Sequence, residues 1–387
     1  MSGVVMLVND FAPVSGGAEK QAERLAGFMA SQKRAILVIT RRHSGLAPEQ
    51  FMNGYTVIRP ATWGPGKIKT VSFVIGTLWV LWHNRKQYSI LHAHMLFGPA
   101  FAAALAGHFL GKRVIVKLGS SGTDGEIQTS LRTLRGRVRL AFLRRWADVI
   151  IALDDTMYNE ALSAGFSVER IYRMVNGIDV SSFASDISQE NLKYSLGIDN
   201  KIVVLFVGRL VPQKSLSTLL KALHQSIKVC PNLSLVLVGN GPEYEMLRNL
   251  SDDLNIQDNI VFAGNQSDVK PYLRAADIFA LPSETEGMSN ALMEAMASGL
   301  PCIATPVGAG PEMLGFGECG VLVPVGDVDA WSKALVGLAQ DSIRRTELGR
   351  AARRRITSEY DFSVVGARYE SLYDELERKT SKDSERN

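Results

Sequence analysis

Short apolar runs alternate with amphipathic segments along the whole chain. The runs are rich in Val, Ile and Leu, which is typical of strands buried on both faces of a parallel sheet. The segments between them space their apolar residues three or four positions apart, as helices do. The pattern therefore predicts an α/β protein in which crossover helices cover parallel sheets.

The first half of the chain contains enough elements for one doubly wound domain. It ends at the turn 175–179, and the polar stretch 181–190 that follows is typical of a linker. We therefore expect a first Rossmann-like domain over residues 1–180. Strands are predicted at 4–8, 35–40, 55–59, 89–93, 113–118, 148–153 and 171–175, and helices at 18–29, 68–86, 98–110, 127–146 and 154–164.

The second half repeats this alternation and predicts a second Rossmann-like domain over 181–360. A helix is expected to open near Lys214, and another carries Met246, Leu247 and Leu250. The tail 361–378 has one apolar stripe and is predicted to be helical, whereas 379–387 looks disordered. Strands are predicted at 202–207, 233–238, 259–262, 278–281, 302–304 and 320–323.

Size and composition fit a two-domain globular protein. The chain has 387 residues, of which 46% are hydrophobic and 21% charged, and it exceeds one comfortable core. Cys230, Cys302 and Cys319 have no spacing typical of disulfides or metal sites, which predicts buried thiols in a reducing cytoplasm. No signal peptide is evident. The apolar stretch 71–82 is shorter than the roughly 20 residues of a membrane span, so a buried or interfacial helix is expected.

Positive charge is concentrated in the first half. Residues 1–180 contain 22 Lys+Arg and 12 Asp+Glu, a net charge of +10, whereas the remainder carries −6. Much of the excess lies in an apparent amphipathic helix. One interpretation is contact with an anionic membrane surface or with an acceptor that carries phosphate. The other is a basic face exposed to solvent. Nucleic acid is not expected, because no recognition motif accompanies the charge. The arginines are Arg132, Arg135, Arg137, Arg139, Arg144 and Arg145.

Two cations follow the first strand of the second half. Arg209 comes directly after Gly208, and Lys214 lies five positions further on. Ligands of such sheets bind at strand ends, so both cations can reach one diphosphate there. Taken alone, each cation could equally be an ordinary surface residue with no ligand. The turn at Gly239 lacks the third glycine and acidic partner of a dinucleotide fingerprint, which makes a dehydrogenase a poor candidate.

Two glutamates frame a polar turn that runs into a helix. Glu286 and Glu294 are eight positions apart, which on a helix separates them by about 12 Å along the axis and about 80° around it. They are too far apart to share one proton. They suit one elongated ligand that is held at two places, with the free amides of the helix N-terminus between them.

These features in this order resemble the retaining family 4 glycosyltransferases. The resemblance covers nearly the whole chain and implies the GT-B architecture of two facing Rossmann-like domains with a cleft, and a C-terminal helix that returns to the N-domain. The motifs that carry it are Gly16-Gly17, Asn176-Gly177-Ile178-Asp179, Val207-Gly208-Arg209-Leu210 with Lys214, Val238-Gly239-Asn240-Gly241-Pro242, Phe262-Ala263-Gly264, Pro282-Ser283, the two glutamates and Ala297-Ser298-Gly299-Leu300-Pro301.

The resemblance implies a role for each matching position. Arg209, Lys214 and Glu286 would be the catalytic residues: the two cations would hold the donor diphosphate and Glu286 the transferred sugar. Glu294 would bind the ribose. Lys and Arg would replace a divalent ion, so no metal and no cofactor are implied. The remaining donor contacts would come from Gly16, Gly17, Gly208, Gly239, Val261, Phe262, Gly287, Met288, Ser289 and Asn290.

One position departs from the family pattern. Many relatives have a histidine at the end of the fifth strand of the N-domain, where this chain has Lys117 followed by a Gly/Ser-rich turn to Gly122. We expect this turn, with Lys117 and Ser120, to lie on the acceptor side. His94, at the end of the preceding strand, is the alternative acceptor contact, and a metal is not expected there because a third ligand is missing.

The predicted function is transfer of a sugar, with retention, from a nucleotide sugar to a glycan or lipid-linked saccharide in cell-surface polysaccharide biosynthesis, lipopolysaccharide included. UDP is preferred over GDP only because it is more frequent in the family. The expected location is the cytoplasm, at the inner face of the membrane. The alternatives are a non-catalytic nucleotide-sugar-binding subunit and a GT-B sugar epimerase.

Overall fold

The computed structural model divides the chain into two compact units. It describes residues 3–13, 16–122, 125–184, 189–195, 197–199 and 201–386. Unit 1 comprises Met1–Gly177 and Phe362–Asn387, and unit 2 comprises Ile178–Asp361. The boundary therefore lies three residues before the predicted one at 180. Within the predicted linker, residues 185–188 lie outside the described residues.

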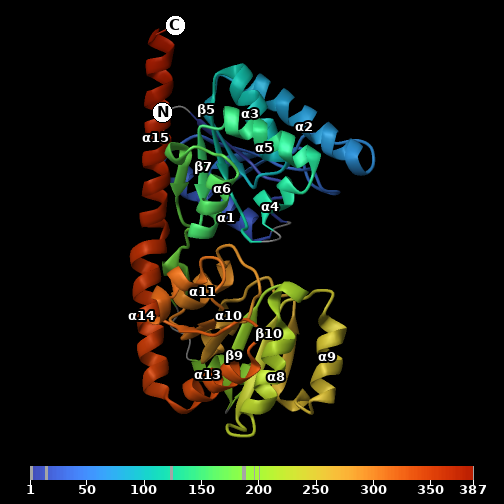
Figure 1. Cartoon of the computed structure of the whole chain (residues 1–387), viewed down its shortest axis with the longest axis vertical. Coiled ribbons are helices and arrows are strands. Elements are labelled where there is room, and N and C mark those ends of the chain that lie inside the picture. Colours follow the sequence, from blue (N-terminus) through green and yellow to red (C-terminus); the bar gives the residue numbers. More distant parts are fainter. Residues whose placement is uncertain are drawn as a thin grey trace. The chain divides into compact units, whose positions relative to one another are not determined.

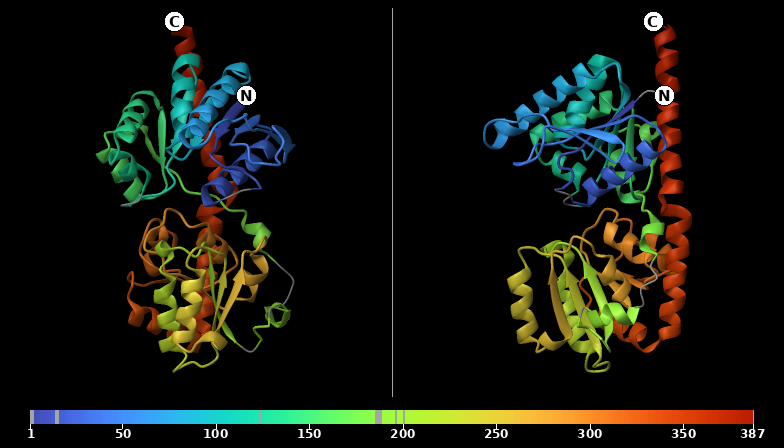
Figure 2. Two further views of the ribbon diagram at one scale, coloured as in Figure 1. Left: turned by 90° about the vertical axis from the view of Figure 1, so that its right-hand side faces the viewer. Right: turned by 180° about the vertical axis from the view of Figure 1, so that it is seen from behind.

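Unit 1 is built on an eight-stranded sheet (Figures 1 and 2). All neighbouring strands are parallel except the first two in spatial order, which form an antiparallel hairpin. In spatial order the strands are β3 (Glu49–Met52), β4 (Tyr55–Ile58), β2 (Ile36–Ile39), β1 (Gly3–Leu7), β5 (Tyr88–His94), β6 (Arg113–Lys117), β7 (Val149–Ala152) and β8 (Ile171–Arg173).

Strand β3 is absent from the sequence-based prediction. Its turn to β4 is Asn53-Gly54, and both residues have positive φ, 48° and 83°. Asn-Gly is the dipeptide that such a two-residue hairpin turn prefers, so the signal was present in the sequence.

Alternate residues of the unit 1 sheet face different helical layers. Val4 and Met6 of β1 belong to a core cluster formed with α1 and α15, whereas α3 contacts the sheet through β1, β5 and β6. The helices are α1 (Gly17–Ser31), α2 (Gly66–His83), α3 (Gly98–Leu110), α4 (Glu126–Leu131), α5 (Leu134–Trp146), α6 (Asp155–Ser163) and α15 (Phe362–Arg386).

The predicted helix 127–146 is interrupted. Thr133 begins a new helix because its side chain accepts a hydrogen bond from the backbone N–H of Gly136, a typical N-cap. The segment therefore forms two helices, α4 and α5, which contact each other.

The last helix, α15, completes unit 1. The stripe expected on the tail is buried, with Tyr369 and Tyr373 each 1% exposed or less. Arg34, whose side chain is fully buried, forms ion pairs with Asp374 and with Glu377, the latter at 3.1 Å. The prediction of disorder over 379–387 is wrong as far as Arg386, because the helix continues through that residue.

Unit 2 contains a six-stranded parallel sheet. In spatial order the strands are β11 (Ile260–Gly264), β10 (Leu233–Val238), β9 (Ile202–Val207), β12 (Ile278–Leu281), β13 (Cys302–Ala304) and β14 (Val321–Leu322). The helices are α7 (Gln189–Ser195), α8 (Leu216–Ser226), α9 (Tyr244–Asp253), α10 (Lys270–Ala275), α11 (Asn290–Ala297), α12 (Gly310–Met313), α13 (Val328–Gln340) and α14 (Ser342–Tyr360).

Strand β9 lies at the centre of this order, between β10 and β12. From β9 the chain adds β10 and β11 on one side of this strand, and it then adds β12, β13 and β14 on the other side. A reversal of this kind leaves a crevice beyond the carboxyl ends of β9 and β12. Of the helices in the described part of the chain, none is both long and apolar enough to cross a membrane.

Candidate active site

The loops after β9 and β12 bring two predicted site residues together. Lys214 ends a short 3-10 turn, η3 (Pro212–Lys214), and Glu286 follows β12 in a loop. The Lys214 ammonium forms an ion pair with Glu286 Oε1, although the residues are 72 positions apart. Their side chains are only 19% and 13% exposed. The pair therefore combines a cation and a hydrogen-bond acceptor at the crevice.

The carboxylate of Glu286 is fixed from its own loop as well. The hydroxyl of Ser283 donates to Glu286 Oε1 at 2.8 Å, and Ser283 is fully buried. Thr305, which follows β13, donates its hydroxyl to the carbonyl of Ser283. The chain of hydrogen bonds ties the position of Glu286 to two neighbouring strand ends.

Three further residues connect the Lys214 turn to the same loop. Ser215 adopts a left-handed backbone with φ of 48°, and its hydroxyl donates to Glu284 Oε1 at 3.1 Å. The backbone N–H of Glu284 donates to the carbonyl of Gln213 at 2.8 Å. Sequence reasoning missed Ser215 and Glu284, because neither has a signal beyond ordinary polarity.

Arg209 lies beside this pair in the chain but differs from it in exposure. The side chain is exposed, and within the described residues it forms no ion pair with a carboxylate. The preceding Gly208 donates its backbone N–H to Val238 O at 2.9 Å. Arg209 is thus an available cation at the carboxyl edge of the sheet, as the diphosphate hypothesis requires.

Gly239 allows the turn after β10 to pack closely against the turn after β9. Its φ is 138°, and a Cβ atom there would lie well inside van der Waals contact with the carbonyl oxygen of Gly208. Its N–H donates to Gly264 O at 2.7 Å. The turn expected at Gly239 and Gly241 is therefore needed for close backbone packing.

The two glutamates do not share a helix. Helix α11 begins at Asn290, and the hydroxyl of its N-cap Ser289 accepts from the N–H of Leu292 at 3.4 Å. Glu286 precedes the cap, so the predicted helical separation of about 12 Å and about 80° is wrong. Glu294 lies on α11 and is 6% exposed. Its contact with a ribose stays a prediction.

The other predicted donor contacts lie in the loop after β12, at the start of α11, and on β11, the first strand in the spatial order. Gly287 accepts a hydrogen bond from Ala309 N–H at 2.9 Å, and the neighbouring Met288 is buried. Val261 and Phe262, on β11, are half-buried. The ring of Phe262 meets Tyr244 edge-on at 5.4 Å between centroids.

The glycine turn of unit 1 caps the first helix. Gly16 is the N-cap of α1, and its N–H donates to Glu19 Oε2 at 3.1 Å. Gly17 is the first residue of the helix. The structure thus places both glycines at a helix N-terminus, where amides can bind a phosphate.

The acceptor-side candidates of unit 1 are largely buried beneath α15. His94 and Lys117 are register partners at the ends of β5 and β6 and are only 2% and 6% exposed. The His94 ring stacks on that of His92 at 4.3 Å, and His92 Nδ1 is 2.8 Å from the hydroxyl of Tyr373. The His94 imidazole is therefore buried in this structure, and its contact with an acceptor stays a prediction.

Burial lowers the pKa values of two of these side chains, His92 and Lys117. Desolvation lowers the pKa of His92 to about 3 and that of Lys117 to about 7. The Lys117 ammonium lies over the ring of Tyr369, 5.4 Å from its centroid. Lys117 is therefore a base that titrates near neutral pH, whereas His92 is neutral there. Ser120, in the turn that follows, is half-buried.

Glu126 joins the loops that follow β5 and β6 and was not anticipated. Its Oε2 accepts from the N–H of Gly119 at 3.0 Å and from the N–H of Leu96 at 3.3 Å. The residue is 1% exposed, and Oε1 has no hydrogen-bond partner among the residues that the structure describes. Burial raises its pKa to about 7, although both backbone donors and Arg139 oppose the change. A protonated carboxyl fits this environment at acidic pH.

We expect Glu126→Gln to stabilise the protein above pH 7. Because folding raises this pKa from 4.5 to about 7, the folded state binds more protons between those values, and the free energy of unfolding falls as pH rises. Glutamine retains an acceptor for both N–H groups and cannot ionise. Urea unfolding should show the variant about 3 kcal/mol more stable at pH 8 and nearly equal at pH 4.5.

The wild-type protein at both pH values is the reference for that measurement. A stability difference of the same size and sign at pH 4.5 and pH 8 would contradict the assigned titration. A loss of stability in the variant at pH 8 would contradict it as well, because it would mean that the charged form is favoured in the folded protein.

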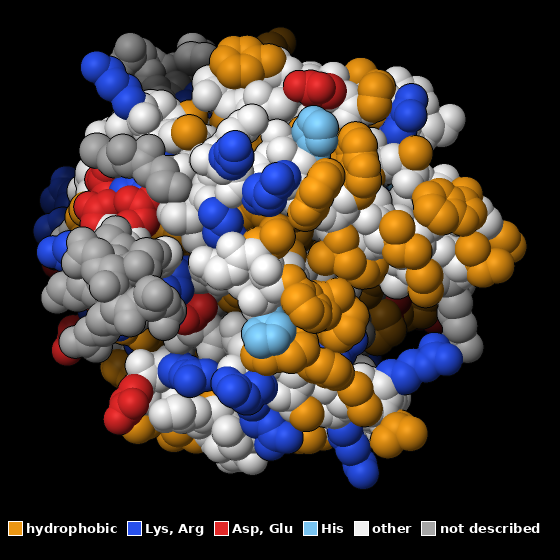
Figure 3. All heavy atoms as spheres, turned by 90° about the horizontal axis from the view of Figure 1, so that it is seen from above, with side chains coloured by type: hydrophobic (Ala, Val, Ile, Leu, Met, Phe, Trp, Pro, Cys, Tyr) orange, Lys and Arg blue, Asp and Glu red, His pale blue; other side chains and the backbone are white. Residues whose placement is uncertain are grey.

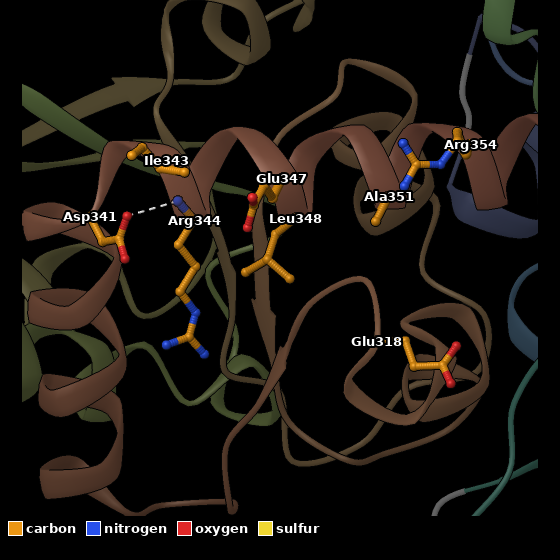
Figure 4. Close-up of a pocket in the computed structure, with 8 residues that line it drawn as sticks. All are labelled: Glu318, Asp341, Ile343, Arg344, Glu347, Leu348, Ala351 and Arg354. Atoms are coloured by element: carbon orange, nitrogen blue, oxygen red, sulfur yellow. Dashed lines mark hydrogen bonds between the residues drawn. The ribbon is translucent and has the colours of Figure 1, made fainter.

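A hollow on the surface of unit 2 lies along α14 (Figure 4). Its volume is about 690 Å³, and Asp341 at one end accepts from the N–H of Arg344 at 2.8 Å. None of the predicted donor-binding residues lines it. Its lining consists of Glu318, Asp341, Ile343, Arg344, Glu347, Leu348, Ala351 and Arg354.

Two family models match the chain one after the other. The model described as Glycosyltransferase Family 4 matches residues 15–182, and the model described as Glycosyl transferases group 1 matches residues 188–355. The chain belongs to the family 4 glycosyltransferases. The two α/β units of this glycosyltransferase are those of the GT-B fold, and its activity is the transfer of a glycosyl group.

Curated relatives and a solved structure resemble this glycosyltransferase over most of its length. It is 28% identical over 291 residues to an N-acetyl-alpha-D-glucosaminyl L-malate synthase of Bacillus anthracis, covering 75% of each chain. It is 26% identical over 391 residues to a GDP-mannose-dependent alpha-(1-6)-phosphatidylinositol monomannoside mannosyltransferase of Mycolicibacterium smegmatis, covering 95% of this chain and 97% of the relative. Anabaena HepE in complex with UDP-glucose superposes with a TM-score of 0.81 at 20% identity, covering 97% and 100% of the two chains.

Proposed function

We propose that this glycosyltransferase moves a sugar from a UDP-sugar to a lipid-linked or glycan acceptor in cell-surface polysaccharide biosynthesis. The observation that carries the proposal is the Lys214–Glu286 pair at the switch point of the unit 2 sheet. The relative from Mycolicibacterium is named for a lipid acceptor, which supports the acceptor class. HepE binds UDP-glucose, which supports the base, whereas the Mycolicibacterium name points to GDP.

The reaction proceeds with retention at the anomeric carbon. The bond from that carbon to the diphosphate breaks while the acceptor oxygen bonds to it on the same face, and the acceptor proton passes to the departing phosphate. Lys214 and Arg209 neutralise the charge that develops on the diphosphate. Glu286 accepts hydrogen bonds from the sugar and stabilises its positive character without forming a covalent bond.

The remaining predicted residues have binding roles. Glu294 holds the ribose, and the amide of Gly17 contacts the diphosphate. The turn that begins at the buried Lys117 and includes Ser120 lies on the acceptor side. The two cations make a metal ion unnecessary, because they supply the charge that would stabilise the leaving diphosphate. The location is the cytoplasm, at the inner face of the membrane; the buried free cysteines, as at Cys302, are compatible with its reducing conditions.

Donor binding can be measured directly. A panel of UDP-, GDP- and ADP-sugars is added to the protein with and without EDTA, and thermal unfolding and sugar transfer are followed. We expect a UDP-sugar to stabilise the protein by about 3 kcal/mol at 100 times its Kd, with no effect of EDTA.

The panel also distinguishes the alternatives. Stabilisation by no member would contradict the donor site, and loss of transfer in EDTA would contradict metal independence. Stabilisation without transfer or hydrolysis would identify a non-catalytic binding subunit. Release of the epimer without an acceptor would identify an epimerase.

A further inference from the structure

Helix α2 presents a row of large apolar side chains to solvent. They recur every three or four positions, which places them along one side of the helix. The opposite side packs inward through Phe73, Val80 and Leu81, each 4% exposed or less. We call the exposed row the α2 face; it consists of Ile68 (55% exposed), Val71 (58%), Ile75 (50%), Trp79 (63%) and Trp82 (54%).

The apolar surface extends beyond α2. Helix α3 contacts both α2 and α5, so the three helices form one layer of unit 1. Phe109 at the end of α3 is 73% exposed, and Leu134 and Val138 of α5 are 78% and 47% exposed. Figure 3 shows a broad band of hydrophobic side chains on this end of unit 1, with Lys and Arg side chains beside it. Monomeric proteins rarely expose a band of this kind unless something binds to it.

The part of the chain that contains α2 and α3 has no acidic residue. From Gln50 to Thr123 the sequence has eight Lys or Arg and neither Asp nor Glu. Arg85 and Lys86 follow the end of α2, and the guanidinium of Arg85 lies over the ring of Trp82 at 4.6 Å from its centroid. The α2 face therefore combines exposed aromatic rings with the neighbouring cations Arg85 and Lys86.

We propose that the α2 face docks on an anionic phospholipid bilayer, with its tryptophans in the headgroup region and Arg85 and Lys86 on lipid phosphates. Tryptophan concentrates at the membrane–water interface, and an apolar helix face bordered by cations binds anionic lipid surfaces. A second copy of the chain is a poorer occupant. Two such faces would bring like charges together, with no carboxylate in the segment to pair with them.

The arginine-rich helix, for which the sequence leaves membrane contact and a solvated basic face open, is less suited to membrane contact. Arg137 and Arg144 of α5 donate to the carbonyls of Leu131 and Ala164. Arg139 bonds the hydroxyl of Ser130 at 2.7 Å. These arginines are engaged within unit 1, so the main contact moves to α2.

The test is sedimentation of the full chain with vesicles of phosphatidylcholine alone or mixed equally with phosphatidylglycerol. We expect binding to the anionic vesicles, weakened by salt, and a decrease of at least about tenfold in Trp79→Gln/Trp82→Gln. Arg85→Gln/Lys86→Gln should remove the preference for anionic lipid. Tyr194→Gln/Ile343→Gln is the matched control, because it replaces two large side chains of unit 2 that are 79% and 71% exposed.

The docking proposal does not depend on the donor, so donor-induced thermal stabilisation should be unchanged in every variant. Equal vesicle binding by Trp79→Gln/Trp82→Gln and the wild type would overturn the proposal, as would equal binding to both kinds of vesicle. A dimer in sedimentation equilibrium that the tryptophan variant dissociates would overturn it in favour of a contact between copies.

Discussion

Lys214→Ala is expected to lower the turnover of this glycosyltransferase by about 10²–10³-fold, the usual effect of removing one group that stabilises transition-state charge. The ammonium is the cation that the crevice holds beside Glu286, and alanine leaves the departing diphosphate with Arg209 alone. The variant should fold normally, because a partly exposed ion pair contributes about 1 kcal/mol or less to stability. Steady-state kinetics with thermal unfolding checks both expectations.

Lys221→Ala is the matched control for this experiment. Lys221 lies on α8, seven positions further along the chain, and its side chain is exposed. Its removal should leave turnover within about twofold of wild type, since surface substitutions away from a site have small effects. Wild-type turnover in Lys214→Ala would remove this lysine from the mechanism.

Gly239→Ala is expected to have the largest effect on stability. The added methyl group would collide with the backbone of Gly208, and φ of 138° is a conformation that alanine rarely adopts. Backbone atoms cannot rotate away as a side chain can. We expect a loss of about 3 kcal/mol or more, seen in thermal unfolding as a decrease in Tm of about 6–12 °C.

Gly337→Ala separates the effect of this site from that of any glycine replacement. Gly337 lies within α13, where an added Cβ would meet nothing within 4 Å. Alanine in a helix interior is favoured over glycine by about 1 kcal/mol, so this variant should be equally or more stable. Similar Tm values for Gly239→Ala and wild type would show that the two turns can separate without cost.

Strands with continuous apolar runs were predictable because burial on both faces leaves little room for polar residues. Strands β9, β10, β12 and β13 agree with the prediction at both ends. Elements whose burial depends on partners distant in the sequence were not predictable. Helix α13 was not predicted, although it packs on α8 and buries Trp331 completely.

Contacts between residues distant in the sequence also limited the prediction of the candidate site. Motif order indicated Lys214 and Glu286 as parts of one site, because parallel strands end at one edge. Nothing local indicated that His92, on which the His94 ring stacks, is covered, since the covering residues Tyr369 and Tyr373 lie more than 270 positions away. Glu126 was missed for a similar reason: the two N–H groups it accepts from belong to other loops.

Unit 1 is built from two segments that lie before and after unit 2 in the sequence, and this has a consequence for synthesis. Residues 178–361 are contiguous and complete before the last helix is made, so unit 2 has all its sequence while unit 1 still lacks α15. Until then His92 and Lys117 have no cover from Tyr369 and Tyr373. On the ribosome, the N-terminal unit is therefore expected to finish folding last, reversing the usual order in which domains mature.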